Sequence, residues 1–256
     1  MTGATIPVFE VPTDPRSPVL YVGDEQAKRI LFIHGFTGSP QSFSPQYRSA
    51  IAAGFNVSVP LLRGHGSQIE DMLDTRYSDY LNDVLVAHRE FCPNGEQIYV
   101  VGLSMGGTLA LDLALRVDNI AAMVLVNPLV LPPAPYFMEI LDQILASGTE
   151  ITPGIGSDIA EPGASEASYP GSPVRAAKSL FEATSVIYKR VGEINIPIRL
   201  FSSSQDHVVS VESGEYLAEN APNVERILLA RSFHVATLDY DKDVISDGIL
   251  EFVGKY

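Results

Sequence analysis

The most informative run in the chain is Gln97-Ile-Tyr-Val-Val-Gly102-Leu103-Ser104-Met105-Gly106-Gly107. Its apolar first half predicts a buried strand, and a helical pattern starts directly after the serine. The pattern G-x-S-x-G holds Ser104 between Gly102 and Gly106, where side chains would crowd a sharp strand-to-helix turn. The sequence therefore predicts a strained turn that exposes Ser104 as a nucleophile, with the positive end of a helix dipole behind it.

Short apolar runs and helical patterns alternate on both sides of this turn. Apolar runs typical of buried parallel strands lie at residues 30–34, 56–60, 97–102, 121–127, 196–201 and 224–230. Helical patterns lie at residues 45–53, 77–91, 105–117, 211–221 and 243–253. This alternation predicts an α/β fold with a doubly wound, mostly parallel sheet. Residues 19–22 are expected to pair antiparallel with residues 29–33 across the polar turn 23–27.

About seventy residues between Asn127 and Ile196 break this alternation, and a structureless loop of that length is uncommon in a compact domain. They show no clear strand. Two amphipathic helical patterns flank a section at residues 148–173 that is rich in Gly, Pro, Ser and acidic residues. The first pattern consists of Phe137, Ile140, Leu141, Ile144 and Leu145, and the second of Leu180, Thr184, Ile187, Tyr188 and Val191. We expect a small helical cap at residues 128–195, inserted into a core domain of residues 1–127 and 196–256. The alternative is an ordinary crossover with decorated loops.

Composition and charge exclude several classes of function. The chain has 256 residues, 46% of them hydrophobic, and a formal net charge of −14, which disfavours binding to nucleic acid. A single cysteine, Cys92, excludes an intramolecular disulfide and a multi-thiolate metal site, and no H-E-x-x-H metal motif occurs. No signal-peptide pattern and no apolar run of roughly 18–20 residues is present. We expect a cytoplasmic protein without integral membrane contact; the composition sets no oligomeric state.

A nucleophilic serine needs a base and an acid, which follow a G-x-S-x-G serine in the order acid, then histidine. Among five histidines, only His207 and His234 come after Ser104. His234 follows the last expected strand, where a loop would place its imidazole over the carboxyl edge of the sheet. Asp206 follows the preceding strand, whereas the other late aspartates come after His234. We therefore predict a Ser104–Asp206–His234 triad, with His207 at the rim of the pocket because adjacent residues rarely pair.

The loop after the first central strand supplies candidate donors for an oxyanion. It has the sequence His34-Gly35-Phe36-Thr37-Gly38, and its glycines allow a tight turn towards Ser104. The backbone N–H groups of Phe36 and Met105 are predicted to form the oxyanion hole. His34 and His65 are expected to bond loop backbone.

These motifs together resemble the bacterial carboxylesterase and monoacylglycerol lipase family of the α/β-hydrolase superfamily. The resemblance covers most of the chain from Leu31 onward and rests on His34–Gly38, Arg63–Gly66, Gly102–Gly107, Ile155–Asp158, Gln205–Val209 and Ser232–Asp239. It implies an α/β-hydrolase fold with a small hydrophobic cap, ester substrates of medium-chain acids, no cofactor and no metal. Side chains expected to line the substrate pocket are Phe137, Met138, Leu141, Ile144, Leu145 and His207.

One position departs from the family pattern. The resemblance implies a glutamate after the cap tyrosine, Tyr169, that bonds glycerol hydroxyls, and Pro170 stands there instead. This favours a broader carboxylesterase for short- to medium-chain esters, with little gain from glycerol; Glu166 and Asp158 are the nearby acids left for that role. Alternatives are a monoacylglycerol lipase proper and a C–C bond hydrolase with the same triad. A non-catalytic receptor is disfavoured because all three triad members are present.

Overall fold

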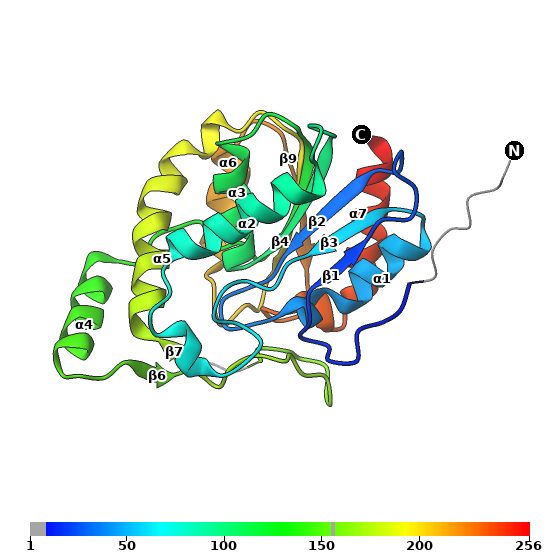
Figure 1. The fold of residues 1–256 in the computed structure, drawn as a ribbon. Helices are drawn as coiled ribbons and strands as arrows, with labels where there is room; N and C mark the ends of the chain where they lie inside the picture. The colour runs from blue at the N-terminus through cyan, green and yellow to red at the C-terminus, as the bar shows by residue number, and fades with distance from the viewer. Residues whose placement is uncertain (1–8, 155–156) are drawn as a thin grey trace, which may run out of the picture.

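A seven-stranded sheet forms the centre of the computed structural model, which describes residues 9–154 and 157–256 (Figure 1). The strand order is β1-β3-β2-β4-β5-β8-β9. The strands are β1 (Val19–Tyr21), β2 (Arg29–Ile33), β3 (Asn56–Val59), β4 (Ile98–Leu103), β5 (Ile120–Val126), β8 (Ile198–Ser203) and β9 (Val224–Leu229). All neighbours in this sheet are parallel except β1 and β3. The predicted α/β fold with a mostly parallel sheet is confirmed.

The expected pairing of the first strand was wrong. β1 pairs antiparallel with β3, Val19 opposite Val59, and not with β2. The reason is that β2 is parallel to β3 on one edge and to β4 on the other, which leaves it no free edge. The side chain of Asn56 then holds the intervening turn, accepting from the N–H of Gly23 at 2.9 Å and donating to the carbonyl of Asp24 at 2.6 Å.

Helices cover both faces of the sheet (Figure 1). They are α1 (Ser44–Ala52), α2 (Tyr77–Phe91), α3 (Met105–Ala114), α6 (Val211–Asn220) and α7 (Lys242–Lys255), with short 3-10 turns η1 (Pro40–Phe43), η2 (Ile69–Met72), η3 (Tyr188–Glu193) and η4 (Ala236–Leu238). The pleat of β4 sends Val100 into a core with α2, α3 and α6, and Val101 into a core with α1 and α7. This burial on both faces explains why the strands show as continuous apolar runs.

The segment between β5 and β8 contains α4 (Pro135–Ala146), β6 (Ile151–Pro153), β7 (Gly171–Pro173) and α5 (Val174–Ile187), and η3 follows α5. The absence of strands predicted here was wrong, because β6 and β7 pair antiparallel, Ile151 opposite Pro173. Their sequences, Ile-Thr-Pro and Gly-Ser-Pro, carry no strand pattern, and backbone bonds make the pair. α5 packs on α2 and α3, with Leu180 and Ile187 in the main core, while α4 packs on α5 at the outside. Ile155 and Gly156 of the family motif lie outside the described residues.

No helix in residues 9–154 and 157–256 is long and apolar enough to cross a bilayer.

Candidate active site

Ser104 stands at the tip of the turn between β4 and α3. Its φ of 55° lies in the left-handed region, which a serine adopts only where the surroundings force it. Those surroundings are close: a Cβ at Gly106 would overlap the carbonyl oxygen of Ile33, and a Cβ at Gly102 would overlap the carbonyl oxygen of Gly106. Only glycine therefore fits at both positions, and the tight packing holds the serine in its strained conformation.

The loops after β8 and β9 bring Asp206 and His234 together. Because these strands are parallel neighbours, their carboxyl ends meet at the same edge of the sheet. Nδ1 of His234 lies 2.7 Å from Oδ2 of Asp206, while Oδ1 accepts from the N–H groups of Val208 and Val209, both at 2.8 Å. Both carboxylate oxygens are thus held, and the remaining ring nitrogen of His234 is left for a substrate or for Ser104.

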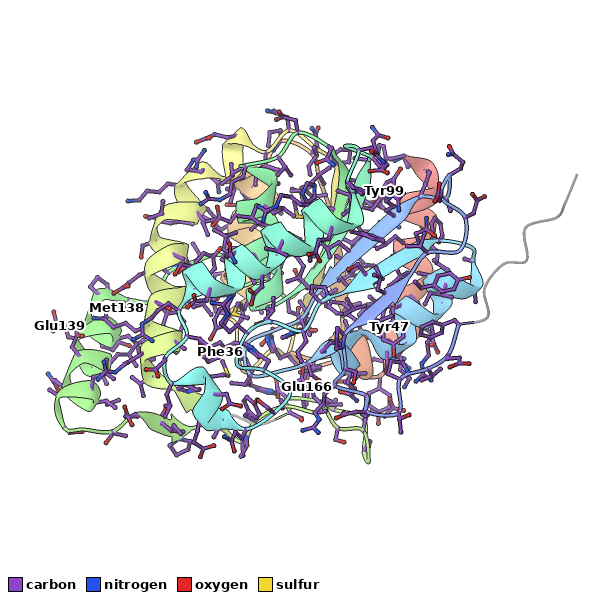
Figure 2. The ribbon with its side chains drawn as sticks, viewed as in Figure 1. Phe36, Tyr47, Tyr99, Met138, Glu139 and Glu166 are labelled. Atoms are coloured by element: carbon purple, nitrogen blue, oxygen red, sulfur yellow. The ribbon has the colours of Figure 1, made fainter. Side chains whose placement is uncertain are left out.

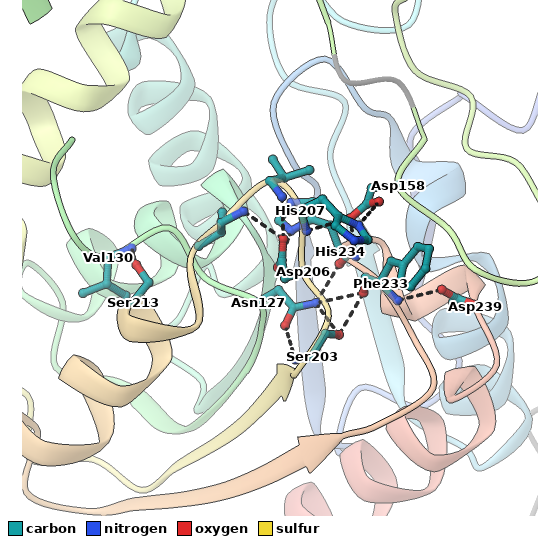
Figure 3. A network of polar contacts seen from close by, with 12 residues as sticks. Asn127, Val130, Asp158, Ser203, Asp206, His207, Ser213, Phe233, His234 and Asp239 are labelled. Carbon is teal, nitrogen blue, oxygen red and sulfur yellow. Dashed lines mark hydrogen bonds and ion pairs between the residues drawn. The ribbon is translucent and has the colours of Figure 1, made fainter. Parts of the chain in front are cut away.

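Asn127, at the end of β5, supports the histidine from below and was not foreseen (Figure 3). Its Nδ2 donates to the carbonyl of His234 at 2.7 Å and to Oγ of Ser203 at 2.9 Å, and its Oδ1 accepts from the N–H of Ser203 at 2.7 Å. The signal was present in the sequence: a polar residue ends an apolar strand, and asparagine is among the residues that tolerate its φ of 43°.

Two buried histidines shape the loop at residues 34–38. Nε2 of His34 accepts from the N–H of Leu62 and Nε2 of His65 accepts from the N–H of Thr37, both at 3.2 Å. Their Nδ1 atoms lie 2.9 Å and 3.0 Å from the carbonyl oxygens of Gly35 and Arg63. Burial lowers the pKa of His34 to about 3 and that of His65 to about 4, so both rings are neutral and bond the loop backbone.

The same loop passes directly over the serine. A Cβ at Gly35 would stand 3.5 Å from Cβ of Ser104, so the next residue, Phe36, lies beside the nucleophile. Met105 is the first residue of α3, and its side chain is fully buried in the core. Phe36 and Met105, the two residues predicted to form the oxyanion hole, are therefore both neighbours of Ser104, one in the 34–38 loop and one in the chain.

Ser104 and His234 line one cavity of about 380 Å³. Its walls come from the 34–38 loop, α4, α5 and the β6–β7 pair and are mostly apolar; the larger side chains are Phe36, Leu129, Phe137, Leu141, Leu180, Phe181 and Val208. A second depression, of about 700 Å³, lies at the amino ends of β2 and β4 and holds Lys28, Arg29 and Glu96 but no serine or histidine. The first cavity is smaller, yet it contains the reactive groups and is the candidate active site.

The expected pocket residues divide into two groups. Phe137 and Leu141, one turn apart on α4, line the cavity. Met138, Ile144, Leu145 and His207 do not, which corrects the expectation. Met138 is turned about 100° from Phe137 around the helix axis, and Ile144 and Leu145 lie one turn beyond Leu141, where α4 has run past the cavity. Figure 2 shows Met138 at the outer end of the molecule, away from Phe36.

His207 faces away from the cavity for a different reason. Its Nδ1 lies 2.8 Å from Oδ1 of Asp158. Its ring packs edge-on against the ring of Phe233, with 4.5 Å between the two ring centroids. The side chain is 55% exposed, and Val208 and Val209 line the cavity in its place. The sequence did not indicate the cavity face of α5, which carries Leu180 and Phe181, because its pattern is also that of a core helix.

The two nearby acids of the 148–173 section have different surroundings. Asp158 does not line the cavity. Its carboxylate accepts hydrogen bonds from the backbone N–H groups of His207 and His234. Glu166, which is labelled in Figure 2, does line the cavity, and its Oε1 accepts a hydrogen bond from Oγ of Ser42 at 2.6 Å. Burial raises the pKa of Glu166, opposed by the Ser42 hydrogen bond and the nearby His234. Pro170 is exposed.

Side chains that bind metal ions are not clustered in the part of the chain that the structure describes. In the described ranges 9–154 and 157–256, no three His, Cys, Asp or Glu side chains gather so that they could hold a metal ion. The nucleophilic and titratable side chains that line the cavity are Ser104, His234, Glu166 and Tyr169, and Asp206 contacts His234 from outside it.

Comparison with known proteins shows the family to which this chain belongs. The model described as the alpha/beta hydrolase family matches residues 30–245. The chain belongs to the alpha/beta hydrolase family. It is 33% identical, over 89% of its length and 90% of the relative's, to a thermostable monoacylglycerol lipase of Bacillus sp. (strain H-257). A carboxylesterase of Bacillus subtilis (strain 168) is 24% identical over 93% of this chain and 96% of its own.

A solved structure gives the same picture. It is reported for LipS and LipT, two metagenome-derived lipolytic enzymes, and superposes with a TM-score of 0.88 at 32% identity, covering 96% of this chain and all of that one. With these relatives, the chain is a lipase/esterase-type hydrolase of its family.

Proposed function

We propose that the protein hydrolyses carboxylic esters through an acyl-enzyme on Ser104. The observation that carries this proposal is the strained Ser104 in one cavity with His234, whose Nδ1 lies 2.7 Å from Asp206. Oγ of Ser104 attacks the ester carbonyl while His234 takes its proton, and His234 then protonates the leaving alkoxide. In the second half-reaction His234 activates a water that releases the acid. Asp206 orients the imidazole and stabilises its charged form.

The two backbone amides beside Ser104 stabilise the tetrahedral intermediate. The N–H groups of Phe36 and Met105 bond the oxyanion, and the positive end of α3 adds to the field there. The neutral His34 and His65 hold the 34–38 loop in the shape that this requires, since each uses one ring nitrogen as an acceptor of a backbone N–H.

Residues 128–195 act as a cap in this proposal, and the apolar wall beneath them binds the acyl chain. Phe137 and Leu141 from α4 and Leu180 and Phe181 from α5 supply most of that wall. Each methylene of a short- to medium-chain acid that the wall buries adds about 0.8 kcal/mol to binding, until the cavity is full.

The leaving alcohol lies towards His234, because that residue must protonate it. Glu166 lines the cavity, and the nearby His234 lowers the pKa of its carboxyl group against the effect of burial, so Glu166 is the acid on this side. The expectation drawn from Pro170, that glycerol adds little to binding, is therefore revised. Glu166 accepts hydrogen bonds from the hydroxyls of a polyol alcohol. Monoacylglycerols, the substrate class in the name of the Bacillus relative, are esters of this kind.

The proposal is tested with p-nitrophenyl esters of increasing acyl length and a serine-reactive phosphonate. The protein should turn over the esters, Ser104→Ala should not, and mass spectrometry should find the phosphonate on Ser104. Modification of another serine, or an active Ser104→Ala variant with the native fold by circular dichroism, would overturn the assignment.

A further inference from the structure

Asp158 belongs to the stretch between β6 and β7, yet its carboxylate bonds both loops that carry the proposed triad (Figure 3). Oδ2 accepts from the N–H of His234 at 3.0 Å and from the N–H of His207 at 3.1 Å. Oδ1 lies 2.8 Å from Nδ1 of His207. His207 adjoins Asp206 in the chain, so one carboxylate spans the loop of the acid and the loop of the base.

The peptide groups around His234 are consequently held from two sides. Asp158 accepts from the N–H of His234, and Asn127 donates to its carbonyl oxygen at 2.7 Å. Asn127 belongs to the sheet and fixes the loop from below, whereas Asp158 fixes it from the inserted segment. The backbone carbonyl of Asp158 adds a third link by accepting from the N–H of Val235 at 3.0 Å.

Asp158 is not needed merely to attach its segment. Asp239 accepts from the N–H groups of Ala160 and Glu161 at 2.7 Å and 2.9 Å, and Lys242 forms an ion pair with Glu161. These contacts fasten the same stretch to the core. The side chain of Asp158 is 9% exposed, and burial of a charge is costly unless hydrogen bonds compensate it. Its bonds to the two loops supply that compensation.

We propose that Asp158 is a positioning residue that sets the spacing between Asp206 and His234, so that the inserted segment must be seated for full turnover. This role rests on the ester hydrolysis proposed above. Asp158 touches neither the cavity nor Ser104, and it acts through the backbone of the two loops. Its loss lets the loops move apart and tilts the imidazole, which slows proton transfer and leaves the ester-binding wall intact.

Three substitutions separate this role from simple anchoring. Asp158→Ala removes all three side-chain bonds. Asp158→Asn keeps one oxygen that accepts from both backbone N–H groups and places an amide nitrogen next to the ring of His207. Asp158→Glu keeps the charge but is one methylene too long for the space between the loops. Glu161→Gln is the matched control, because it weakens an anchor of the same stretch without touching either loop.

The measurements are kcat and KM for p-nitrophenyl butyrate, the rate of phosphonate labelling at Ser104, and the melting temperature. Asp158→Ala should lower kcat about 100-fold with KM within a few-fold, and should slow the labelling in parallel. Asp158→Asn should restore kcat to within about fivefold of the wild type. The kcat of Asp158→Glu should lie between those of Asp158→Ala and Asp158→Asn. The kcat of Glu161→Gln should match that of the wild type.

Each contrary result has a distinct meaning. A folded Asp158→Ala variant with wild-type kcat, or one in which only KM rises, overturns the positioning role. If that variant does not fold, the comparison of Asp158→Asn with Asp158→Glu decides, and equal wild-type kcat for both overturns the role. If the wild type itself neither hydrolyses the ester nor reacts at Ser104, the proposed function fails and the positioning role fails with it.

Discussion

Nδ1 of His234 lies 2.7 Å from Oδ2 of Asp206, across 28 residues of chain. The contact exists because β8 and β9 are adjacent parallel strands that end at the same edge of the sheet. The other oxygen of Asp206 is held by two backbone N–H groups, so the carboxylate cannot rotate away from the ring. In the proposed mechanism Asp206 is therefore a fixed group that orients His234.

Asp206→Asn should lower kcat for p-nitrophenyl esters about 10⁴-fold, because the amide favours the wrong tautomer of His234. The loss should be smaller than that of Ser104→Ala, about 10⁶-fold, since the oxyanion donors and substrate binding survive. Steady-state kinetics measures both values. Asp243→Asn, an exposed aspartate on α7, is the control and should leave kcat unchanged. A loss of less than tenfold in Asp206→Asn would mean that another acid orients the histidine.

The second prediction concerns the acyl side of the cavity. kcat/KM for p-nitrophenyl esters should rise with acyl length by up to about fourfold per methylene, and then fall where the chain meets the wall. Ala177 lies in that wall on α5, so Ala177→Leu should move the optimum to shorter acids. Ala146→Leu, on the exposed outer end of α4, should not move it. A flat response to acyl length would remove the acyl site from the proposal.

The third prediction concerns the alcohol side. The wild type should prefer a monoacylglycerol to the methyl ester of the same acid, and Glu166→Gln should lower that ratio of kcat/KM about tenfold. Ser42→Ala is the control, since it removes the hydrogen bond to Glu166 but keeps the carboxylate in the cavity. An equal ratio for wild type and Glu166→Gln would restore the expectation drawn from Pro170, in which the alcohol side lacks a hydroxyl partner.

The comparison of Asp158 with Glu166 shows where sequence reasoning stops. Both acids stand in the same section rich in Gly, Pro and Ser, and nothing local separates them. Their roles depend on partners far along the chain: Asp158 bonds His234, 76 residues away, and Glu166 bonds Ser42, 124 residues away. The turn at Ser104 was predictable because its requirement is local, two glycines around one serine between a strand and a helix.

Strand order is likewise a long-range property. The apolar runs predicted β2, β3 and β4 because a strand that is buried on both faces has a continuous apolar sequence, whichever strands lie beside it. The partner of β1 depends on which edge of the sheet is free, which its three residues do not encode. The β6–β7 pair left no sign in the sequence because its short segments, Ile-Thr-Pro and Gly-Ser-Pro, carry no alternating apolar pattern.

The last prediction concerns stability at acidic pH. The folded protein keeps His65 neutral until about pH 4, since burial lowers its pKa, whereas in the unfolded chain a histidine titrates near about 6.5. Below about pH 6.5 the unfolded state therefore binds a proton that the folded state does not bind. Because of this difference, the free energy of unfolding falls as the pH falls. The contribution of His65 is fully present above about pH 6.5 and is lost towards pH 4, at up to about 1.4 kcal/mol per pH unit.

His65→Gln removes this titration while leaving an amide near the N–H of Thr37. The variant should be less stable than the wild type at pH 7, because Gln cannot reproduce both hydrogen bonds of the ring. Its free energy of unfolding should nevertheless fall less steeply between pH 6.5 and 4.5, by up to about 1.4 kcal/mol per pH unit. Urea unfolding at half-unit steps of pH measures both slopes. Parallel slopes would mean that the ring of His65 takes up its proton as readily in the folded protein as in the unfolded chain, so that burial does not keep it neutral below about pH 6.5.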